Sequence, residues 1–212
     1  MNKNETSASG HSSLVWQDGH VSSEDRAALL GQRAATVWFT GLSGAGKSTL
    51  AFALERQLIS AGRACYVLDG DNVRHGLNRD LGFSAEHRTE NIRRIAEVAR
   101  LMNDAGLIVI SAFISPYRED REIARQIIGE ARFIEVHVAT PIATCEQRDT
   151  KGFYQRARAG EIKNFTGISA PYEPPESPAV SIDTSVMPLD VALADLVKML
   201  EPRLRFEATK TK

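Results

Sequence analysis

The feature that most restricts the fold of this chain is a glycine-rich segment, residues 41–48, with the sequence G-L-S-G-A-G-K-S. It matches the pattern G-x-x-x-x-G-K-[ST]; the strand-forming residues 36–40 precede it and a helix-forming segment follows it. In this arrangement backbone N–H groups and a helix N-terminus surround phosphate oxygens. Lys47 adds a positive charge toward the β- and γ-phosphates, and the Ser48 hydroxyl can ligate Mg²⁺. The sequence therefore predicts a binding site for a nucleoside triphosphate.

The rest of the chain has the composition of an ordinary globular domain. Its 212 residues can bury a self-sufficient core, and a net charge of -1 gives no global attraction to nucleic acid or to membranes. No apolar run approaches the ~18 residues that span a bilayer, and no signal peptide is recognised. Cys65 and Cys145 are too few for a disulfide framework or a zinc site. We therefore expect a cytoplasmic enzyme or nucleotide-dependent switch that binds neither nucleic acid nor a membrane.

Strand patterns and helix patterns alternate along the chain. Runs of strand-forming residues lie at 36–40, 64–68, 107–114, 133–138 and 180–182. Apolar residues at helical spacing lie at 48–60, 85–105 and 189–200. Strands separated by helices predict an α/β fold, a three-layer sandwich whose parallel β-sheet is covered by helices on both faces. In such a sheet the ligand lies beyond the carboxyl ends of the strands.

The two ends of the chain differ in composition from the region between them. The first residues are rich in Ser, Asn and Thr without an apolar period, and the last are basic and polar. We expect a flexible N-terminal segment at 1–22, a P-loop kinase domain at 23–202 and a flexible tail at 203–212.

Two carboxylates follow the second predicted strand. Asp69 and Asp71 are two residues apart in an extended segment, so both side chains lie on one side of it. One can act as a base toward a substrate hydroxyl while the other helps to hold Mg²⁺. The alternative is a simple Asp-Gly turn. Arg74, just beyond, offers a guanidinium suited to an anionic group on a second substrate.

Polar residues also follow the third and fourth predicted strands. Ser115 precedes a proline, and from the residues alone a turn role and a role in binding substrate or accepting phosphate are equally open. Residues 148–163 carry five cations, with glycines among them. Such a run is usually a solvated helix face, but phosphoryl transfer needs cations and a cover that excludes water. We favour a mobile basic lid. The cations are Arg148, Lys151, Arg156, Arg158 and Lys163.

Four further residues stand near the predicted site. Arg88 and Asn91 are three apart near the start of a helix and therefore face the same way. Phe83 precedes that helix, and Phe165 follows the basic segment. Each aromatic ring is either a loop anchor or a plate that stacks on a base, and the residues alone favour anchoring.

Taken together, these blocks resemble the adenylylsulfate kinase family from residue 14 to the last helix. The phosphate loop is shared by many kinases, but the combination of the other blocks is far more specific. They read V-W-F-T-G-L-S-G-A-G-K-S-T, L-D-G-D-N-V-R-H-G-L-N, D-L-G-F-S, R-T-E-N-I-R-R, F-I-S-P-Y-R, C-E-Q-R-D and K-G-F-Y-Q-R-A-R-A-G-E-I-K-N-F-T-G. This family phosphorylates adenosine 5′-phosphosulfate on its ribose 3′-hydroxyl.

The resemblance implies a role for each matching residue. It makes Asp71 the base and Lys47 a catalytic cation, assigns Mg²⁺ to Ser48 and Asp69, and marks Ser115 as a position described in the family as a phosphoserine. It also turns the two aromatic rings into a sandwich for adenine. The implied ATP site is Gly41, Leu42, Ser43, Gly44, Ala45, Gly46, Lys47, Ser48, Thr49 and Arg148. The implied adenylylsulfate site is Asp71, Arg74, Phe83, Arg88, Asn91, Ile114, Ser115, Lys151, Asn164 and Phe165.

The resemblance also implies partners. ATP and adenosine 5′-phosphosulfate are the expected substrates, Mg²⁺ is the expected cofactor, and such enzymes are commonly homodimers. Some are fused to the ATP sulfurylase that makes their substrate, whereas we expect the free-standing form here. The other hypotheses are a kinase of another small metabolite, of the gluconate or shikimate type, and a nucleotide-dependent switch. The sequence lacks the N-K-x-D motif that a guanine-specific switch would carry.

Overall fold

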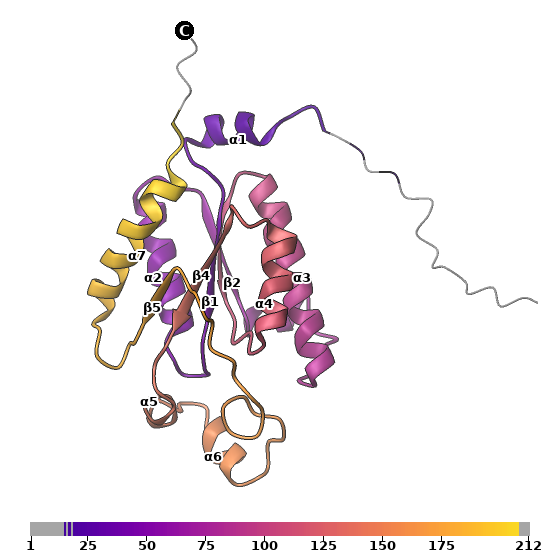
Figure 1. Ribbon diagram of the computed structural model, residues 1–212, viewed down its shortest axis with the longest axis vertical. Coiled ribbons are helices and arrows are strands. Elements are labelled where there is room, and N and C mark those ends of the chain that lie inside the picture. The colour runs from indigo at the N-terminus through magenta and orange to yellow at the C-terminus, as the bar shows by residue number, and fades with distance from the viewer. Residues whose placement is uncertain (1–14, 16, 18, 208–212) are drawn as a thin grey trace, which may run out of the picture.

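The computed structural model describes residues 15, 17 and 19–207 and consists of one parallel sheet with helices on both faces (Figure 1). The spatial order of the strands is β2-β3-β1-β4-β5, so the strand that leads into the phosphate loop is central. The strands are β1 (Thr36–Thr40), β2 (Cys65–Asp69), β3 (Ile108–Ala112), β4 (Phe133–Val138) and β5 (Val180–Ile182). The sheet therefore confirms the predicted fold class.

Helices of different length surround this sheet. The long ones are α2 (Lys47–Ser60), α3 (Ala85–Asp104), α4 (Arg118–Ile128) and α7 (Leu189–Leu204). The short ones are α1 (Ser23–Leu30), the 3₁₀ turn η1 (Asn72–His75), α5 (Ile142–Gln147) and α6 (Phe153–Arg158). Figure 1 shows α2 and α7 on one face, α3 and α4 on the other, and α5 with α6 at one end of the sheet. In the described part of the chain, no helix combines the length and apolarity of a membrane span.

Two apolar cores hold the layers together, one on each face. All five residues of β1 are buried, because both faces of a central strand are covered. Val37 and Phe39 pack with the apolar stripes of α2 and α7, whereas Trp38 packs with those of α3 and α4. This burial fixes the direction of β1 and hence the place where the phosphate loop begins.

The structure adjusts several predicted boundaries. The third strand ends at Ala112, short of the predicted residue 114, and the chain then leaves the sheet. The last helix continues to Leu204, which is buried, and Arg205 forms a bridge with Gln32. Residues 203 and 204 of the expected tail therefore belong to α7, because burial of Leu204 extends the helix. Residues 1–14, 16, 18 and 208–212 of the expected flexible ends lie outside the described residues.

Candidate active site at the carboxyl ends of the strands

A cavity of about 640 Å³ opens beyond the carboxyl ends of the central strands. The phosphate loop forms one wall, the segments after β2 and β3 form others, and residues 148–154 reach over from the basic segment. This is where a parallel sheet places a ligand. Most predicted site residues line the cavity: Ser43, Gly44, Gly46, Lys47, Ser48, Thr49, Asp69, Asp71, Arg74, Phe83, Arg88, Asn91, Ile114, Ser115, Arg148 and Lys151.

The phosphate loop takes its shape from close contacts with the end of β4 and with α5. A Cβ atom on Gly41 would lie 2.5 Å from the Val138 carbonyl oxygen. Gly44 has φ of 73°, and a Cβ there would lie 2.9 Å from the Cys145 carbonyl oxygen. Only glycine fits such contacts without moving the backbone. Two glycines of the motif thus stand at the positions where the backbone of another segment comes too close for a side chain.

Hydroxyl groups from distant segments also hold the loop. The Ala45 carbonyl accepts hydrogen bonds from the Oγ1 atoms of Thr140 and Thr184, at 3.0 and 2.9 Å. The Tyr154 hydroxyl donates to the Ser43 carbonyl at 2.9 Å. Sequence patterns did not mark these three residues as part of the site. Thr140 and Thr184 follow β4 and β5 directly, so the strand-end rule applied to all five strands identifies both.

Lys47 is buried at the base of the loop. Its Nζ donates to the carbonyls of Gly41 and Leu42, at 2.9 and 2.7 Å. Burial lowers the pKa of Lys47 to about 8, although Asp69 and Asp71 nearby oppose the shift. The ammonium group is therefore ready to exchange two backbone oxygens for phosphate oxygens, which carry full negative charge.

Ser48 and Asp69 form the oxygen pair expected for a magnesium site. The Ser48 hydroxyl donates to Asp69 Oδ2 at 2.7 Å, and Asp69 Oδ1 accepts the N–H groups of Asp71 and Asn72 at 3.0 and 3.3 Å. Among the described residues no group of three or more His, Cys, Asp or Glu side chains could hold a metal ion. Mg²⁺ suits such a sparse oxygen set, because it usually keeps several waters and binds substrate phosphates.

Asp71 lies at the mouth of the cavity. Its carboxylate forms an ion pair with Lys151, and both side chains are exposed, at 69% and 57%. The pair joins the segment after β2 to the basic segment. Asp71 is thus free of the backbone bonds that hold Asp69, and its carboxylate can move toward a substrate hydroxyl. The two aspartates are therefore held differently: backbone N–H groups and Ser48 hold Asp69, whereas Lys151 is the partner of Asp71.

The second half of the cavity holds cations and an exposed ring. The Arg74 guanidinium lies over the Phe83 ring, 4.5 Å from its centre. Arg88 donates to the Phe83 carbonyl at 3.0 Å and, across the cavity mouth, to Thr166 Oγ1 at 2.5 Å and the Asn164 carbonyl at 2.6 Å. Arg88 therefore ties the start of α3 to the segment after α6.

The structure does not bring every predicted residue to the cavity. The Phe165 ring packs edge-on against Tyr154, 4.9 Å between centres, and against the core beside α2. Phe83 is 64% exposed, and neither Asn164 nor Phe165 lines the cavity. The predicted sandwich of adenine between Phe83 and Phe165 is not formed in this conformation. Phe165 therefore anchors its loop to the core, which is the role that the residues alone favoured.

Ser115 lies in a strained turn. Its φ is 38°, a left-handed value that L residues seldom adopt, and the residue is 2% exposed. Its Oγ accepts the indole N–H of Trp38 at 3.2 Å, and its carbonyl accepts Arg121 at 2.7 Å. Arg121 in turn forms a buried ion pair with Glu135 at 2.7 Å. Every one of these contacts fixes the turn.

Comparison with known proteins gives consistent results. A family model described as adenylylsulphate kinase matches residues 33–183. Adenylyl-sulfate kinases of Shewanella amazonensis and Staphylococcus carnosus are 61% and 52% identical, over 88% and 89% of this chain and 94% of each relative. A solved APS kinase of Mycobacterium tuberculosis, in complex with AMPPNP and APS, is 48% identical with a TM-score of 0.77; the match covers 80% of this chain and 98% of that one.

Proposed function

This chain belongs to the adenylylsulfate kinase family, and we propose that it transfers the γ-phosphoryl group of ATP to the 3′-hydroxyl of adenosine 5′-phosphosulfate. The products are 3′-phosphoadenylylsulfate and ADP, and the reaction belongs to sulfate assimilation. One observation carries the proposal beyond the family: the phosphate loop and the cluster of Arg74, Arg88 and Asn91 line the same cavity. A single cavity can therefore hold a triphosphate and a second anionic nucleotide.

ATP would lie along the phosphate loop. Backbone N–H groups of residues 41–49 would surround the phosphates, with Lys47 contacting the β- and γ-phosphates. Arg148, which lines the cavity beside Thr184, would contact the same nucleotide. Ser48 and Asp69 would hold Mg²⁺, which supplies positive charge that offsets the charge on the transferring phosphoryl group.

Asp71 would accept the proton of the 3′-hydroxyl as that oxygen attacks the γ-phosphorus. Asp71 lies at the cavity mouth between the phosphate loop and the Arg74 cluster, and its only recorded side-chain partner in the described chain is Lys151. An exposed carboxylate with a displaceable partner can turn toward a hydroxyl in the cavity. The bond from the γ-phosphorus to the β,γ-bridging oxygen breaks, and ADP leaves.

Adenylylsulfate would occupy the half of the cavity that lies toward α3. Arg74 and Arg88 offer guanidinium groups to its anionic groups, and the exposed Phe83 ring offers a stacking face for adenine. Ile114, Ser115, Lys151 and Asn164 would complete this half. Phe165 would join the stack only if residues 164–166 moved, so we propose that the basic segment and these residues form a lid that closes over the bound nucleotide.

The surroundings of Ser115 support direct transfer. Its Oγ accepts the buried Trp38 N–H, and the hydroxyl has no carboxylate or histidine partner in the described chain. Direct in-line transfer needs only positioned reactants and positive charge, both of which the cavity supplies. We therefore place Ser115 in the wall of the substrate site without a phosphoserine step.

Family resemblance also supports three proposals about the whole chain. Residues 23–202 would form the body of the kinase domain, two copies would form a homodimer in the cytoplasm, and an ATP sulfurylase would supply the substrate. Light scattering on the purified protein would test the dimer, since a monomeric mass at working concentration contradicts it.

A coupled assay for ADP release tests the central proposal. We expect turnover with ATP, Mg²⁺ and adenylylsulfate and none with gluconate or shikimate in its place. Equilibrium binding of adenylylsulfate in the presence of ADP completes the test, because a nucleotide switch would have no second nucleotide site. Turnover of another hydroxyl compound alone would make the chain a different metabolite kinase.

A further inference from the structure

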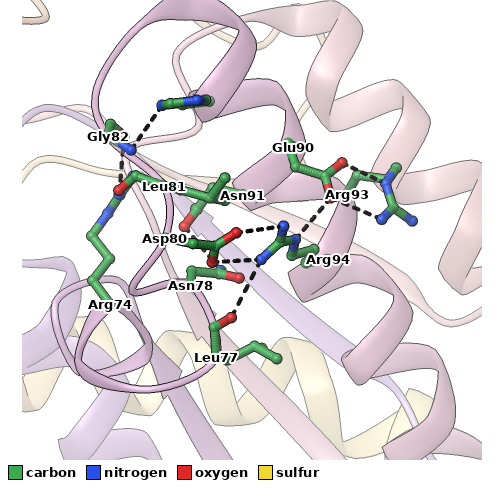
Figure 2. Close-up of polar contacts among 11 residues, drawn as sticks. Arg74, Leu77, Asn78, Asp80, Leu81, Gly82, Glu90, Asn91, Arg93 and Arg94 are labelled. Atoms are coloured by element: carbon green, nitrogen blue, oxygen red, sulfur yellow. Dashed lines mark hydrogen bonds and ion pairs between the residues drawn. The ribbon is translucent and has the colours of Figure 1, made fainter.

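The segment that carries Arg74 and Phe83, residues 72–83, is fastened to helix α3 by polar contacts (Figure 2). Arg94 of α3 donates to both carboxylate oxygens of Asp80, at 2.8 and 2.9 Å. The Gly82 N–H donates to His87 Nδ1 at 2.8 Å. These contacts are exposed, so water competes with them and each contributes little to stability. They explain why the segment lies on α3 but not how it discriminates between ligands.

One contact between the same two elements is different, because it is buried. Asn78 Nδ2 donates to Asn91 Oδ1 at 3.0 Å, and the two residues are 0% and 4% exposed. Asn78 lies behind Asn91, which lines the cavity. The Asn78 side-chain oxygen has no hydrogen-bond partner in the described chain. A buried polar atom without a partner is costly, so its retention calls for a functional explanation.

The chemistry of a primary amide supplies that explanation. The group has one acceptor oxygen and one nitrogen with two N–H donors. Asn78 donates to the side-chain oxygen of Asn91, and within residues 19–207 the Asn91 side-chain nitrogen has no protein acceptor. The N–H donors of Asn91 are therefore the end of its amide that is available to a molecule in the cavity.

We propose that Asn78 is a positioning residue for the second nucleotide: it holds the Asn91 amide with its N–H donors toward the cavity, where they select an acceptor oxygen of the anionic substrate. This inference rests on the proposed function and deepens it. Arg74 and Arg88 attract any anion, whereas an oriented amide demands an acceptor at one place. Asn78 acts only through Asn91 and touches no substrate.

A double-mutant cycle tests the inference, with ADP release measured while adenylylsulfate and ATP are varied in turn. We expect Asn91→Ala to raise KM for adenylylsulfate ~10-fold and Asn78→Ala ~5-fold, since each removes or misdirects one bond to a charged group. The double variant should be no worse than Asn91→Ala, because Asn78 has no route to substrate except Asn91. KM for ATP should stay within ~2-fold throughout.

Two further variants separate positioning from stability. Asn103 is also a buried asparagine of α3, bonded to Thr36 and to the Leu107 carbonyl, and it does not line the cavity. Asn103→Ala should lower the unfolding temperature and leave both KM values unchanged. Asn78→Asp offers Asn91 only acceptors, so it should turn the Asn91 donors away from the cavity and raise KM for adenylylsulfate at least as much as Asn78→Ala.

Additive effects in the double variant, or equal rises in both KM values, would overturn the inference. If Asn78→Ala does not fold, Asn78→Ser shortens the side chain more gently and enters the same cycle. The failure of the proposed function looks different: the unchanged protein would then release no ADP with adenylylsulfate. If the unchanged protein turns over normally but the effects of Asn78→Ala and Asn91→Ala on KM for adenylylsulfate add, only the proposed role of Asn78 is contradicted.

Discussion

The phosphate loop and the basic segment at 148–163 both supply groups to one cavity, but they are built in opposite ways. The loop is enclosed: its Lys47 is buried, and its Ala45 carbonyl accepts two threonine hydroxyls. Three cations of the basic segment, Lys151, Arg156 and Arg158, form ion pairs on the exposed surface. Exposed pairs contribute at most about 1 kcal/mol. An enclosed phosphate loop therefore lies beside a segment whose exposed ion pairs cost little to break.

The ion pair of Asp71 with Lys151, which joins the segment after β2 to the basic segment, gives the prediction with the largest effect. Asp71→Asn should lower kcat by ~10² or more while ATP binding is retained, because the 3′-hydroxyl loses its base. Rapid-quench measurement of ADP formation, with ATP affinity from calorimetry, checks this. Lys151→Ala is the matched control, because it removes the same ion pair and keeps the carboxylate.

The control decides between two roles for Asp71. If Asp71 is the base, Lys151→Ala should mainly raise KM for adenylylsulfate and leave kcat within ~5-fold. Equal losses of kcat in both variants would make Asp71 a latch for the basic segment and remove the base from the mechanism.

Two arginines of the basic segment sharpen the comparison further. Arg148 donates to Thr184 Oγ1 at 2.6 Å and to the Thr184 carbonyl at 2.9 Å, next to the phosphate loop. Arg158 pairs with Glu146 outside the cavity. Arg148→Ala should raise KM for ATP ~10-fold and Arg158→Ala less than ~2-fold, since only Arg148 contacts a wall of the site. If both variants raise KM for ATP by a similar factor in steady-state assays, the segment acts through its total positive charge and not through a specific contact of Arg148.

The sequence predicts a strand or helix well where the buried residues of that element are apolar, and poorly where they are charged. Strands β1, β4 and β5 have the predicted bounds, because fully covered parallel strands are continuous apolar runs. Helix α4 was missed altogether. Its buried face consists of Asp120, Arg121, Ala124 and Ile128, so charged residues replace half of the apolar stripe that a pattern search needs. Helices α5 and α6, with six residues each, are too short to show a period.

The same reasoning explains what the sequence showed of the site. A phosphate loop is contiguous, and its glycines mark backbone positions that can be recognised without tertiary information. The orientation of Phe165 depends on Tyr154, and the Asn78 contact depends on how a loop lies on α3. Pairings between distant segments leave no local pattern. The family resemblance supplied roles for residues but not their conformations.

The buried state of Lys47 predicts a dependence on pH that the exposed cations should not share. Because burial lowers its pKa to about 8, rising pH removes its charge before ATP binds. Cys145, Asp69 and Asp71 are the titratable groups that face Lys47, and burial raises the pKa of the Cys145 thiol. ATP affinity should therefore fall ~5-fold between about pH 7.0 and about pH 8.7, as the protonated fraction falls.

Calorimetry in buffers of different ionisation enthalpy measures the linked proton. At about pH 8 binding should take up about half a proton, because phosphate oxygens restore the charge of Lys47. Lys47→Arg is the control, since a guanidinium stays charged at these pH values. This variant should bind ATP without proton uptake. Proton uptake that persists in Lys47→Arg would assign the titration to another group.

Ser115 gives the smallest expected effect and the sharpest contrast with Asp71. Both residues follow a strand and both line the cavity, but Asp71 is exposed and Ser115 is 2% exposed. A phosphate acceptor needs a free hydroxyl and a base, whereas the Ser115 hydroxyl accepts the Trp38 N–H and its carbonyl holds Arg121. Ser115→Ala should keep turnover within ~3-fold and cost about 1–2 kcal/mol of stability, since Trp38 loses its acceptor.

Initial rates, thermal unfolding and mass spectrometry of quenched enzyme test this contrast. Direct transfer predicts no phosphorylated form of the protein at any time during turnover. A loss of kcat near 10²-fold in Ser115→Ala, with phosphate recovered on Ser115 of the unchanged enzyme, would instead require the turn after β3 to open during each cycle. Ser115, Trp38 and Arg121 are all buried. That result would therefore also show that the buried wall of the site moves during turnover as much as the exposed basic segment does.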